Sequence, residues 1–539
     1  SRGIRVVAEL DTPGHSAAYT KYVYENQEEV IKALVDKNYL NRADYLDSEG
    51  NIKEGVSFYI HNPNNFELLA IDENSTDTET RQNAVHAKIF MTALFDEYLE
   101  GDDPVFTSDT VSAGVDEYWD KNTGNNKEAF RSYMNDMYEL LRDKYGKEVR
   151  MWGALEAIPG TTEPNKNIIL EIWNGRGEDN VHNRIREGYR VINVPQMFLY
   201  VTPGRYHKDI IREEYIYNNW DPTLFDGGNG GARVDKGEPS VLGAKAALWG
   251  DANRSGTTEA DLNERYLRSC AMVSEKTWGG QKADDTFLEY EQTFDRLREG
   301  PGTKIANQID SKTNVVLDYN FENVSKDGAT IYDASGNGYN GTITNGTVVQ
   351  QAGEAMLKFD GNTKIETPLT SLGYPYTMSF DVYLDGSENN TKESSLFSGY
   401  DGRLQAAGMN GSLSLNRDYF TQSFDYQIEQ RVKHRITIVG TYQVTKLYVD
   451  GRFVKILYAA ARDIDNGGSL GNQNWTDSDN NYTSTFVFPL NTIGQGFSGY
   501  LGNIKAYNKS LSTEELAAEG FTGTGEADVA RNRHAYTES

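Results

Sequence analysis

The sequence predicts two kinds of fold in one chain, a parallel α/β domain followed by an all-β domain. Up to about residue 297, short apolar runs alternate with longer stretches in which apolar residues recur every three or four positions. Such alternation is typical of parallel strands joined by helices. From about residue 313, short alternating runs are separated by Gly, Asn and Asp, which is typical of a β-sandwich. The length of 539 residues also exceeds what one hydrophobic core serves.

In the first part we expect strands at Ile4–Leu10, Val105–Val115, Val149–Leu155, Ile168–Trp173, Tyr189–Val194 and Leu242–Trp249. Helical patterns lie between them, as in Asn83–Leu99 and Lys127–Lys144. Several strands end in acidic or aromatic residues, and the carboxyl ends of the strands in a (β/α)8 barrel carry its active site. The prediction is a partial (β/α)8 TIM barrel over residues 1–297, because only six strands are recognisable.

The second part shows period-2 strands at Tyr376–Leu384, Arg435–Val439 and Lys446–Val449, the last followed by an Asp450-Gly451 turn. Many short strands with such turns predict an all-β jelly-roll sandwich over residues 313–521. Residues 298–312, which include a Gly-Pro-Gly run, form the expected linker, and residues 522–539 form a loosely ordered tail. Because the sandwich would have its own core, we expect it to melt independently of the barrel.

Composition narrows the range of partners. The chain has 53 Lys and Arg against 80 Asp and Glu, a formal net charge of −27. So negative a surface repels phosphate backbones and anionic lipid heads, which argues against nucleic acid and membrane surfaces as partners. No apolar run reaches the roughly 18 residues of a membrane helix. The single cysteine, Cys270, excludes an internal disulfide and is expected to be a buried, inert thiol. The 34 Tyr and 7 Trp favour flat polar ligands such as sugars.

Titratable residues gather at the ends of two expected strands. The first strand runs into Glu9, Asp11 and His15 through a Pro-Gly turn, and the second ends in the adjacent pair Asp116-Glu117. Adjacent residues of an ideal strand point to opposite faces, so this pair needs a bent strand end to serve one pocket. The Asp-Glu dipeptide alone has little specificity, because it also occurs at Asp72-Glu73.

Together these segments resemble glycoside hydrolase family 20, the β-N-acetylhexosaminidases with their lacto-N-biosidase branch. The family's Glu-x-Asp-x-Pro-Gly-His strand is similar to residues 9–15, and its Gly-x-Asp-Glu strand to residues 114–117. Residues 151–153, 171–173 and 247–251 are similar to its tryptophan-bearing strand ends, and residues 194–200 to the stretch with its acetamido-contacting tyrosine. The motifs occur in the family's order over about residues 1–290.

The resemblance implies a retaining hydrolase in which the 2-acetamido oxygen of the substrate attacks the anomeric carbon and forms an oxazolinium ion. It implies Glu117 as general acid/base, Asp116 as the carboxylate that orients the acetamido group, and Tyr200 as donor to the acetamido oxygen. His15 is similar to the histidine that tunes the acid/base. The implied substrate-binding residues are Trp152, Trp173, Trp249, Asp251 and Asp11. No catalytic cofactor or metal is implied.

Two departures from the family pattern matter. The family's first two barrel strands carry a substrate-binding arginine and an aspartate that partners the histidine, whereas this chain begins at what matches the third strand. We therefore expect strands 3–8 of an N-terminally truncated barrel, with weak or absent catalysis by this chain alone. In addition, Val201 and Thr202 follow Tyr200, where the family often has an aspartate two residues on.

The second part resembles laminin-G-like, concanavalin-like modules, through residues 317–321, 333–338, 447–451 and 499–507. Such modules often bind glycans, and some bind calcium. Asp333 and Asn337 are candidate Ca²⁺ ligands, because oxygen-rich loops suit a hard cation. An Asn/Gly turn without a metal is the favoured alternative.

Two functions therefore stand side by side. The first is an exo-acting enzyme that removes β-linked N-acetylhexosamine or lacto-N-biose from oligosaccharides, glycoproteins or mucins. The alternative is a non-catalytic carbohydrate-binding protein with a degenerate barrel. The joint presence of Asp116, Glu117, Tyr200 and His15 favours the enzyme, since a decayed site would have lost members. A secreted or cell-surface location in a bacterium is expected.

Overall fold

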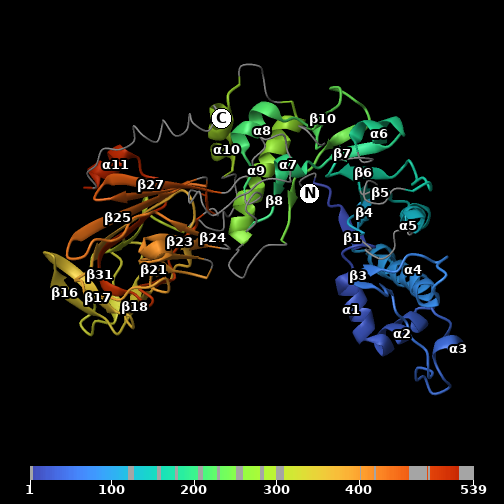
Figure 1. Ribbon diagram of the computed structural model, residues 1–539, viewed down its shortest axis with the longest axis horizontal. Coiled ribbons are helices and arrows are strands. Elements are labelled where there is room, and N and C mark those ends of the chain that lie inside the picture. The colour runs from blue at the N-terminus through green and yellow to red at the C-terminus, as the bar shows by residue number, and fades with distance from the viewer. Residues whose placement is uncertain are drawn as a thin grey trace.

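A computed structural model describes most of the chain. It covers residues 4–118, 127–153, 160–175, 180–203, 210–226, 231–250, 259–279, 285–298, 309–400, 402–417, 420–442, 444–459, 482–483 and 486–520. The parallel-strand part and the all-β part lie at the two ends of an arch, with helices between them (Figure 1). Most of the expected linker, and all of the expected tail at 522–539, lie outside the described residues.

The first part is built on a parallel sheet. Within the described residues its six strands are β1 (Ala8–Thr12), β4 (Thr110–Gly114), β5 (Glu148–Trp152), β6 (Ile169–Ile172), β7 (Arg190–Asn193) and β11 (Val241–Ala244). Neighbours in the sheet follow the order of the chain, and every pair is parallel. A further parallel pair joins β8 (Tyr200–Val201) to β12 (Ala247–Leu248). This is a TIM-barrel-like arrangement, and the six predicted strands are confirmed.

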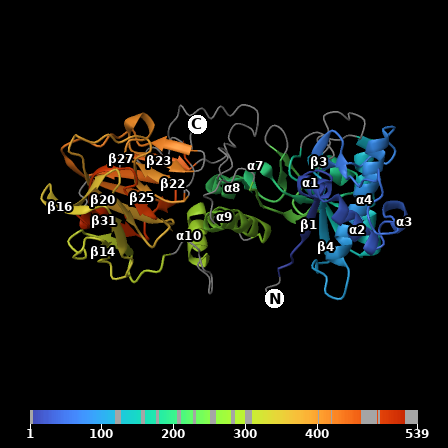
Figure 2. The same cartoon turned by 90° about the horizontal axis from the view of Figure 1, so that it is seen from below.

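Helices cover one face of this sheet. They are α1 (Ala17–Glu25), α2 (Gln27–Asp36), α3 (Arg42–Tyr45), α4 (Thr78–Leu99), α5 (Lys127–Glu139), a π-helical turn (Leu140–Lys144) and α6 (Val181–Arg186). The strands alternate, so Val149 and Met151 of β5 join the core beneath the helices, together with Phe95 of α4 and Phe130 of α5. Arg150 and Trp152 therefore face the other side of the sheet. Figure 2 shows α4 and α2 on the outer side of β1 and β4.

Three details differ from expectation. The first strand begins at Ala8, and Ile4 and Val6 before it are exposed rather than paired. The last expected strand is interrupted, so β11 pairs with β7 while β12 pairs with β8. Cys270 is exposed, so the expectation of a buried thiol is wrong. Its helix presents this side chain to a cavity rather than to the core.

Short elements complete the first part. A small hairpin joins β2 (His61–Asn62) to β3 (Asn65–Leu69), and another joins β9 (Leu224–Phe225) to β10 (Ala232–Arg233). The helices α7 (Gln196–Leu199), α8 (Glu213–Asn219), α9 (Glu259–Thr277) and α10 (Phe287–Leu297) follow later in the chain. In both views, α8, α9 and α10 lie between the parallel sheet and the all-β part (Figures 1 and 2).

The second part consists of two large sheets. One contains, in the described residues, β13 (Val315–Tyr319), β16 (Thr347–Gln351), β17 (Glu354–Asp360), β20 (Tyr376–Tyr383), β25 (Lys433–Gly440), β26 (Val444–Val449), β27 (Arg452–Ala459), β28 (Tyr482–Thr483) and β31 (Ser498–Tyr507). The other contains β14 (Thr330–Ile331), β15 (Gly341–Thr344), β18 (Lys364–Glu366), β21 (Ser395–Ser398), β22 (Gly402–Gln405), β23 (Ser414–Arg417), β24 (Phe420–Ser423) and β30 (Thr492–Ile493). A short pair, β19 (Ser371–Leu372) with β29 (Phe488–Pro489), and α11 (Thr513–Ala518) complete it.

The two large sheets share one apolar core. Phe380 of β20 packs against Phe397 of β21 with ring centroids 5.0 Å apart, and Tyr376 packs against Phe488 at 5.7 Å. The predicted strands around Tyr376, Arg435 and Lys446 are confirmed, and the turn at Asp450 has the positive φ that a tight hairpin requires. The jelly-roll and laminin-G-like descriptions stay predictions.

The two parts touch through a buried contact. Tyr442, which follows β25, packs with Ile210 and with the partly buried Tyr374. The guanidinium carbon of Arg268 on α9 lies 4.3 Å from the centroid of the Tyr442 ring. Arg268 also pairs with Glu213 at 2.9 Å. The expectation of independent melting took no account of this contact.

No helix in the described part of the chain is long and apolar enough to cross a membrane.

Candidate active site

A bent strand end carries the carboxylate pair. After β4, the backbone enters the left-handed region at Gly114 (φ 71°), Val115 (φ 71°) and Glu117 (φ 47°). A β-branched residue such as Val115 adopts this conformation at a cost, so the surrounding structure must impose it. The bend that the adjacent pair Asp116-Glu117 needs in order to serve one pocket is therefore present.

Two glycines allow the two strand ends to approach closely. A Cβ atom on Gly14 would lie 2.4 Å from the backbone oxygen of Asp116, and one on Gly114 would lie 1.9 Å from Oδ1 of Asp11. Neither position tolerates a side chain without a shift of its neighbour. The loop after β1 thus packs directly on the end of β4, as parallel neighbours permit.

This approach brings His15 to both carboxylates. Its Nε2 atom lies 3.4 Å from Oε2 of Glu117 and 3.8 Å from Oδ2 of Asp116. A hydrogen bond with Glu117, with further help from the charge of Asp116, raises the pKa of His15 to about 9. At neutral pH the imidazole is therefore protonated and lies between the two acidic side chains.

Asp11 and Asp116 form a second, more buried pair beside His15. Burial, together with the charge of Asp116, raises the pKa of Asp11 to about 8, and burial raises the pKa of Asp116 to about 6. One buried carboxylate oxygen of each has no hydrogen-bond partner among the described residues. One carboxylate oxygen each of Asp11 and Asp116 and one ring nitrogen of His15 lie within 4.8 Å of one another, close enough to share protons or to bind a cation.

Aromatic side chains form a wall on the other side of the carboxylates. Tyr200 of β8 is 8% exposed, and its ring centroid lies 5.8 Å from that of Trp249. Trp249 lies equally far from Trp152, and Trp173 packs on the same group. Burial, and then the charge of Asp116, raise the pKa of Tyr200 well above its usual value, so its hydroxyl keeps its proton. The indole N–H of Trp173 is buried and has no partner among the described residues.

A charged network beneath this wall was not foreseen from the sequence. Glu9 accepts hydrogen bonds from the indole N–H of Trp152 (3.3 Å) and from the hydroxyl of Ser112 (2.6 Å). The ammonium of Lys245 lies 4.3 Å from the Trp152 ring centroid and 2.6 Å from the buried carboxylate of Glu171. Glu171 and Lys245 each stand as the one charged residue in an expected apolar strand, and this pattern in the sequence could have indicated both.

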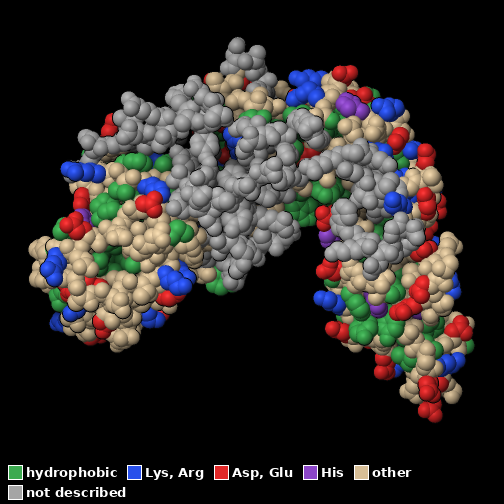
Figure 3. Space-filling view, in the orientation of Figure 1, with side chains coloured by type: hydrophobic (Ala, Val, Ile, Leu, Met, Phe, Trp, Pro, Cys, Tyr) green, Lys and Arg blue, Asp and Glu red, His purple; other side chains and the backbone are tan. Residues whose placement is uncertain are grey.

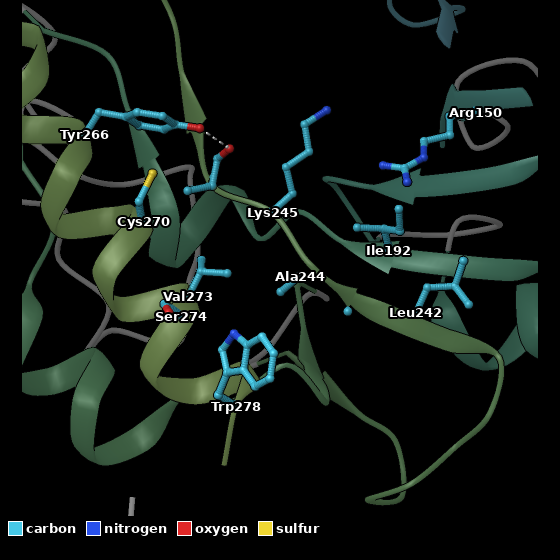
Figure 4. Close-up of a pocket in the computed structure, with 12 residues that line it drawn as sticks. Arg150, Ile192, Leu242, Ala244, Lys245, Tyr266, Cys270, Val273, Ser274 and Trp278 are labelled. Atoms are coloured by element: carbon cyan, nitrogen blue, oxygen red, sulfur yellow. Dashed lines mark hydrogen bonds between the residues drawn. The ribbon is translucent and has the colours of Figure 1, made fainter. Parts of the chain in front are cut away.

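A cavity of about 490 Å³ lies next to this network, between β7, β11 and α9. In Figure 4, the side chains of Lys245 and Arg150 extend from the strands, while Cys270 and Trp278 come from the α9 side. The hydroxyl of Tyr266 donates to the backbone oxygen of Ala246 at 3.2 Å. The residues that line the cavity include Lys245 but neither Asp116 nor Glu117, so it is not the reaction centre predicted from the motifs.

The remaining predicted residues lie elsewhere. Asp251 is outside the described residues. Asp333 lies in the sandwich, where its carboxylate accepts the backbone N–H groups of Asp318 (3.0 Å), Ser335 (3.0 Å) and Tyr339 (3.1 Å). The amide of Asn337 donates to two backbone oxygens, each at 2.9 Å, and its oxygen accepts an N–H. These contacts hold the loop together.

Paired carboxylates, a histidine and an aromatic wall at the carboxyl ends of parallel strands are typical of enzymes that act on carbohydrates. The family model for the catalytic domain of glycosyl hydrolase family 20 matches residues 1–281, in agreement with this class of enzyme. The chain belongs to glycosyl hydrolase family 20.

Individual relatives are more distant. A lacto-N-biosidase from Bifidobacterium bifidum is 25% identical over 297 residues, covering 55% of this chain and 24% of that protein. A β-hexosaminidase A from Caenorhabditis briggsae is 24% identical over 333 residues, covering 55% of this chain and 50% of that protein. The crystal structure of Dispersin B shares 21% identity at a TM-score of 0.38, over 51% of this chain and 73% of that one. The chain thus spans a half or less of these curated relatives' length.

Proposed function

We propose that the protein is an exo-acting, retaining glycoside hydrolase that removes β-linked N-acetylhexosamine or lacto-N-biose from glycans, with catalytic assistance from the substrate's acetamido group. The substrates would be N-acetylhexosamine-terminated oligosaccharides, glycoproteins or mucins outside the cell. Family membership supports the class of reaction. The arrangement of this chain's own side chains supports the mechanism.

One observation carries the proposal. The side chains of His15, Asp116 and Glu117 lie together at the bent end of β4. The Tyr200 hydroxyl keeps its proton, because burial and the charge of Asp116 both raise its pKa. A reaction assisted by the substrate needs an acid/base, a carboxylate for the acetamido N–H, and a donor for the acetamido oxygen. In the proposed mechanism these four side chains supply all three groups.

In the proposed reaction, the acetamido oxygen attacks the anomeric carbon while the bond from that carbon to the leaving oxygen breaks. The Glu117 carboxyl gives its proton to the leaving oxygen. Asp116 accepts the acetamido N–H and stabilises the positive charge on the oxazolinium nitrogen, and Tyr200 donates to the acetamido oxygen. The Glu117 carboxylate then takes a proton from the water that attacks the anomeric carbon, while the bond from that carbon to the acetamido oxygen breaks and the acetamido group is regenerated, so the configuration is retained.

A thiazoline analogue of the oxazolinium intermediate tests this proposal independently of turnover. Calorimetry should detect binding by the 539-residue chain, and Asp116→Asn should weaken that binding, because an amide cannot stabilise the positive charge. Asp72→Asn, in another Asp-Glu dipeptide of the chain, is the matched control and should bind as the wild type does. Failure of both the wild type and the control to bind the analogue would show that the proposed mechanism is wrong.

A further inference from the structure

Four aromatic rings form a compact cluster on α1 and the β2–β3 hairpin. The Tyr24 ring stacks on Tyr59 with centroids 5.5 Å apart and meets Phe66 edge-on at 5.1 Å. The His61 ring lies 3.9 Å from that of Phe66, nearly parallel to it, and also meets the edge of Tyr24. The cluster joins Tyr24 to residues that lie 35 to 42 positions later in the chain.

Tyr24 is the open member of the cluster. It is 50% exposed although three rings fix its position, whereas His61 is buried. Nδ1 of His61 is buried and has no hydrogen-bond partner among the described residues, and burial lowers the pKa of His61. In Figure 3, hydrophobic and histidine side chains gather on the surface over α1 and β3, whose places are labelled in Figure 1. An exposed ring held in one orientation suits a flat ligand with an apolar face.

The hairpin is attached to the catalytic segment at several points. The backbone N–H of Ser16, which follows His15, donates to Glu67 at 2.9 Å, and that of Leu69 donates to Pro13 at 2.9 Å. The hydroxyl of Tyr118, which follows Glu117, donates to the backbone oxygen of Leu69 at 3.1 Å. The ring cluster and the carboxylate pair are therefore held in one rigid unit.

The sheet order places this cluster on a particular side of Glu117. Glu117 follows β4, which lies between β1 and β5. Trp152, Trp173 and Trp249, the proposed wall for the sugar that is removed, lie at the ends of β5, β6 and β12, on one side of Glu117. The hairpin contacts the loop after β1, on the opposite side. A substrate cleaved at Glu117 must extend to that opposite side.

We propose that the exposed Tyr24 ring is a platform for the glycan on the leaving-group side of the bond that Glu117 protonates. The ligand is the sugar chain beyond the scissile bond, whose apolar ring face stacks on Tyr24. The inference rests on the proposed function. It adds a specificity-determining surface made by α1 and the β2–β3 hairpin, which makes long glycans better substrates than short glycosides.

The test compares two substrates with the same terminal unit, a nitrophenyl glycoside and an oligosaccharide of at least four sugars. Tyr24→Leu keeps apolar cover over Tyr59 and Phe66 but removes the flat ring, so KM for the oligosaccharide should rise about three- to tenfold while kcat is unchanged. The nitrophenyl glycoside, which has no sugar on the leaving side, should be hydrolysed as by the wild type. Tyr24→Phe keeps the ring and should restore the wild-type KM.

Tyr22→Ala is the matched control, because Tyr22 is similarly exposed on the same helix and contacts Glu29 rather than the cluster. It should leave both substrates unaffected. If Tyr24→Leu leaves the oligosaccharide unaffected, or slows both substrates equally, the platform is overturned while the proposed function stands. If the wild type neither hydrolyses a substrate nor binds the thiazoline analogue, the proposed function fails and the platform with it.

Discussion

Asp116 at the end of β4 and Asp333 in the sandwich both lie close to turns, but their carboxylates are used differently. Asp333 accepts three backbone N–H groups and the hydroxyl of Ser335, which lies at 2.7 Å, so its carboxylate is occupied by its own loop. Asp116 is partly buried beside Asp11 and Glu117 on a strand end with positive φ angles, and one of its oxygens has no partner among the described residues.

Asp333 therefore stabilises its own loop, whereas we interpret Asp11 and Asp116 as carboxylates kept for binding a ligand. Placing several acidic groups together without enough donors costs folding free energy, and a sequence keeps such an arrangement where it serves chemistry. The raised pKa values of Asp11 and Asp116 express that cost. Four changes test this contrast, beginning with the largest expected effect.

In a complete enzyme, Glu117→Gln should lower turnover on glycosides with poor leaving groups by about 10²–10⁴, the usual contribution of general acid catalysis. With an activated phenol as leaving group the loss should be smaller, because that oxygen hardly needs a proton. Steady-state kinetics on the two substrates measure the difference. Glu73→Gln removes a surface carboxylate paired with Lys88 and is the control that should leave both rates unchanged. Equal losses on both substrates would exclude Glu117 as the acid.

Tyr442→Ala should lower the free energy of unfolding by about 2–4 kcal/mol, because it removes a buried ring and uncovers the Arg268–Glu213 ion pair. Denaturant titration should show the loss in both parts of the molecule, since the ring belongs to one and the ion pair to the other. Tyr400→Ala, at an exposed tyrosine of the sandwich, should change little. A loss confined to the sandwich transition would restore the expectation of independent melting.

Asp11→Asn should change the pH dependence of stability. A carboxyl whose pKa is raised in the folded state stabilises the protein below its unfolded pKa, near 4, and this stability is lost as pH rises through the folded value of about 8. The substitution removes the ionisation, so at pH 9 it should raise the free energy of unfolding by about 1–3 kcal/mol, with little effect at pH 4.

Thermal melts between pH 4 and pH 9 measure this effect. Exposed loop carboxylates of the sandwich provide the contrast: hydrogen bonds within their loops lower the pKa values of Asp360 and Asp385. These carboxylates stabilise the folded protein above their unfolded pKa, and this stabilisation is lost as pH falls. The pH dependence of stability therefore has the opposite sign to that caused by Asp11. Asp385→Asn should therefore cost stability at neutral pH and not at pH 3. A flat profile for Asp11→Asn relative to the wild type would contradict the raised pKa.

Calcium should have the smallest effect. Because the oxygens of Asp333 and Asn337 already hold their own loop, millimolar Ca²⁺ should shift the melting temperature by less than about 1 °C. Chelation of Ca²⁺ with EDTA should likewise leave the melting temperature unchanged. A stabilisation that rises with Ca²⁺ concentration and disappears in Asp333→Ala would show that the loop is a metal site after all.

Local patterns predicted much of the fold. Alternating apolar residues located the strands that contain Val149 and Ile436, and the family resemblance implied that His15 would lie beside the acid/base Glu117. The sequence did not predict the contact between Tyr442 and Arg268 or the packing of Tyr24 against the other aromatic rings. These contacts join segments that are far apart in the chain, so they produce no periodic pattern in the sequence. Lys245 was missed because its contact with Glu171 joins residues more than seventy positions apart in the chain.

The close approach of Gly114 to Asp11 has a consequence for how this sequence can change over time. A methyl group at position 114 would overlap the Asp11 carboxylate, with 1.9 Å between the atoms. The same methyl group would lie 2.7 Å from the backbone Cα atom of Asp11, and Gly114 has a φ of 71°, so a shorter side chain at position 11 does not open a route away from glycine. Homologous sequences should therefore keep glycine at position 114 even where position 11 varies.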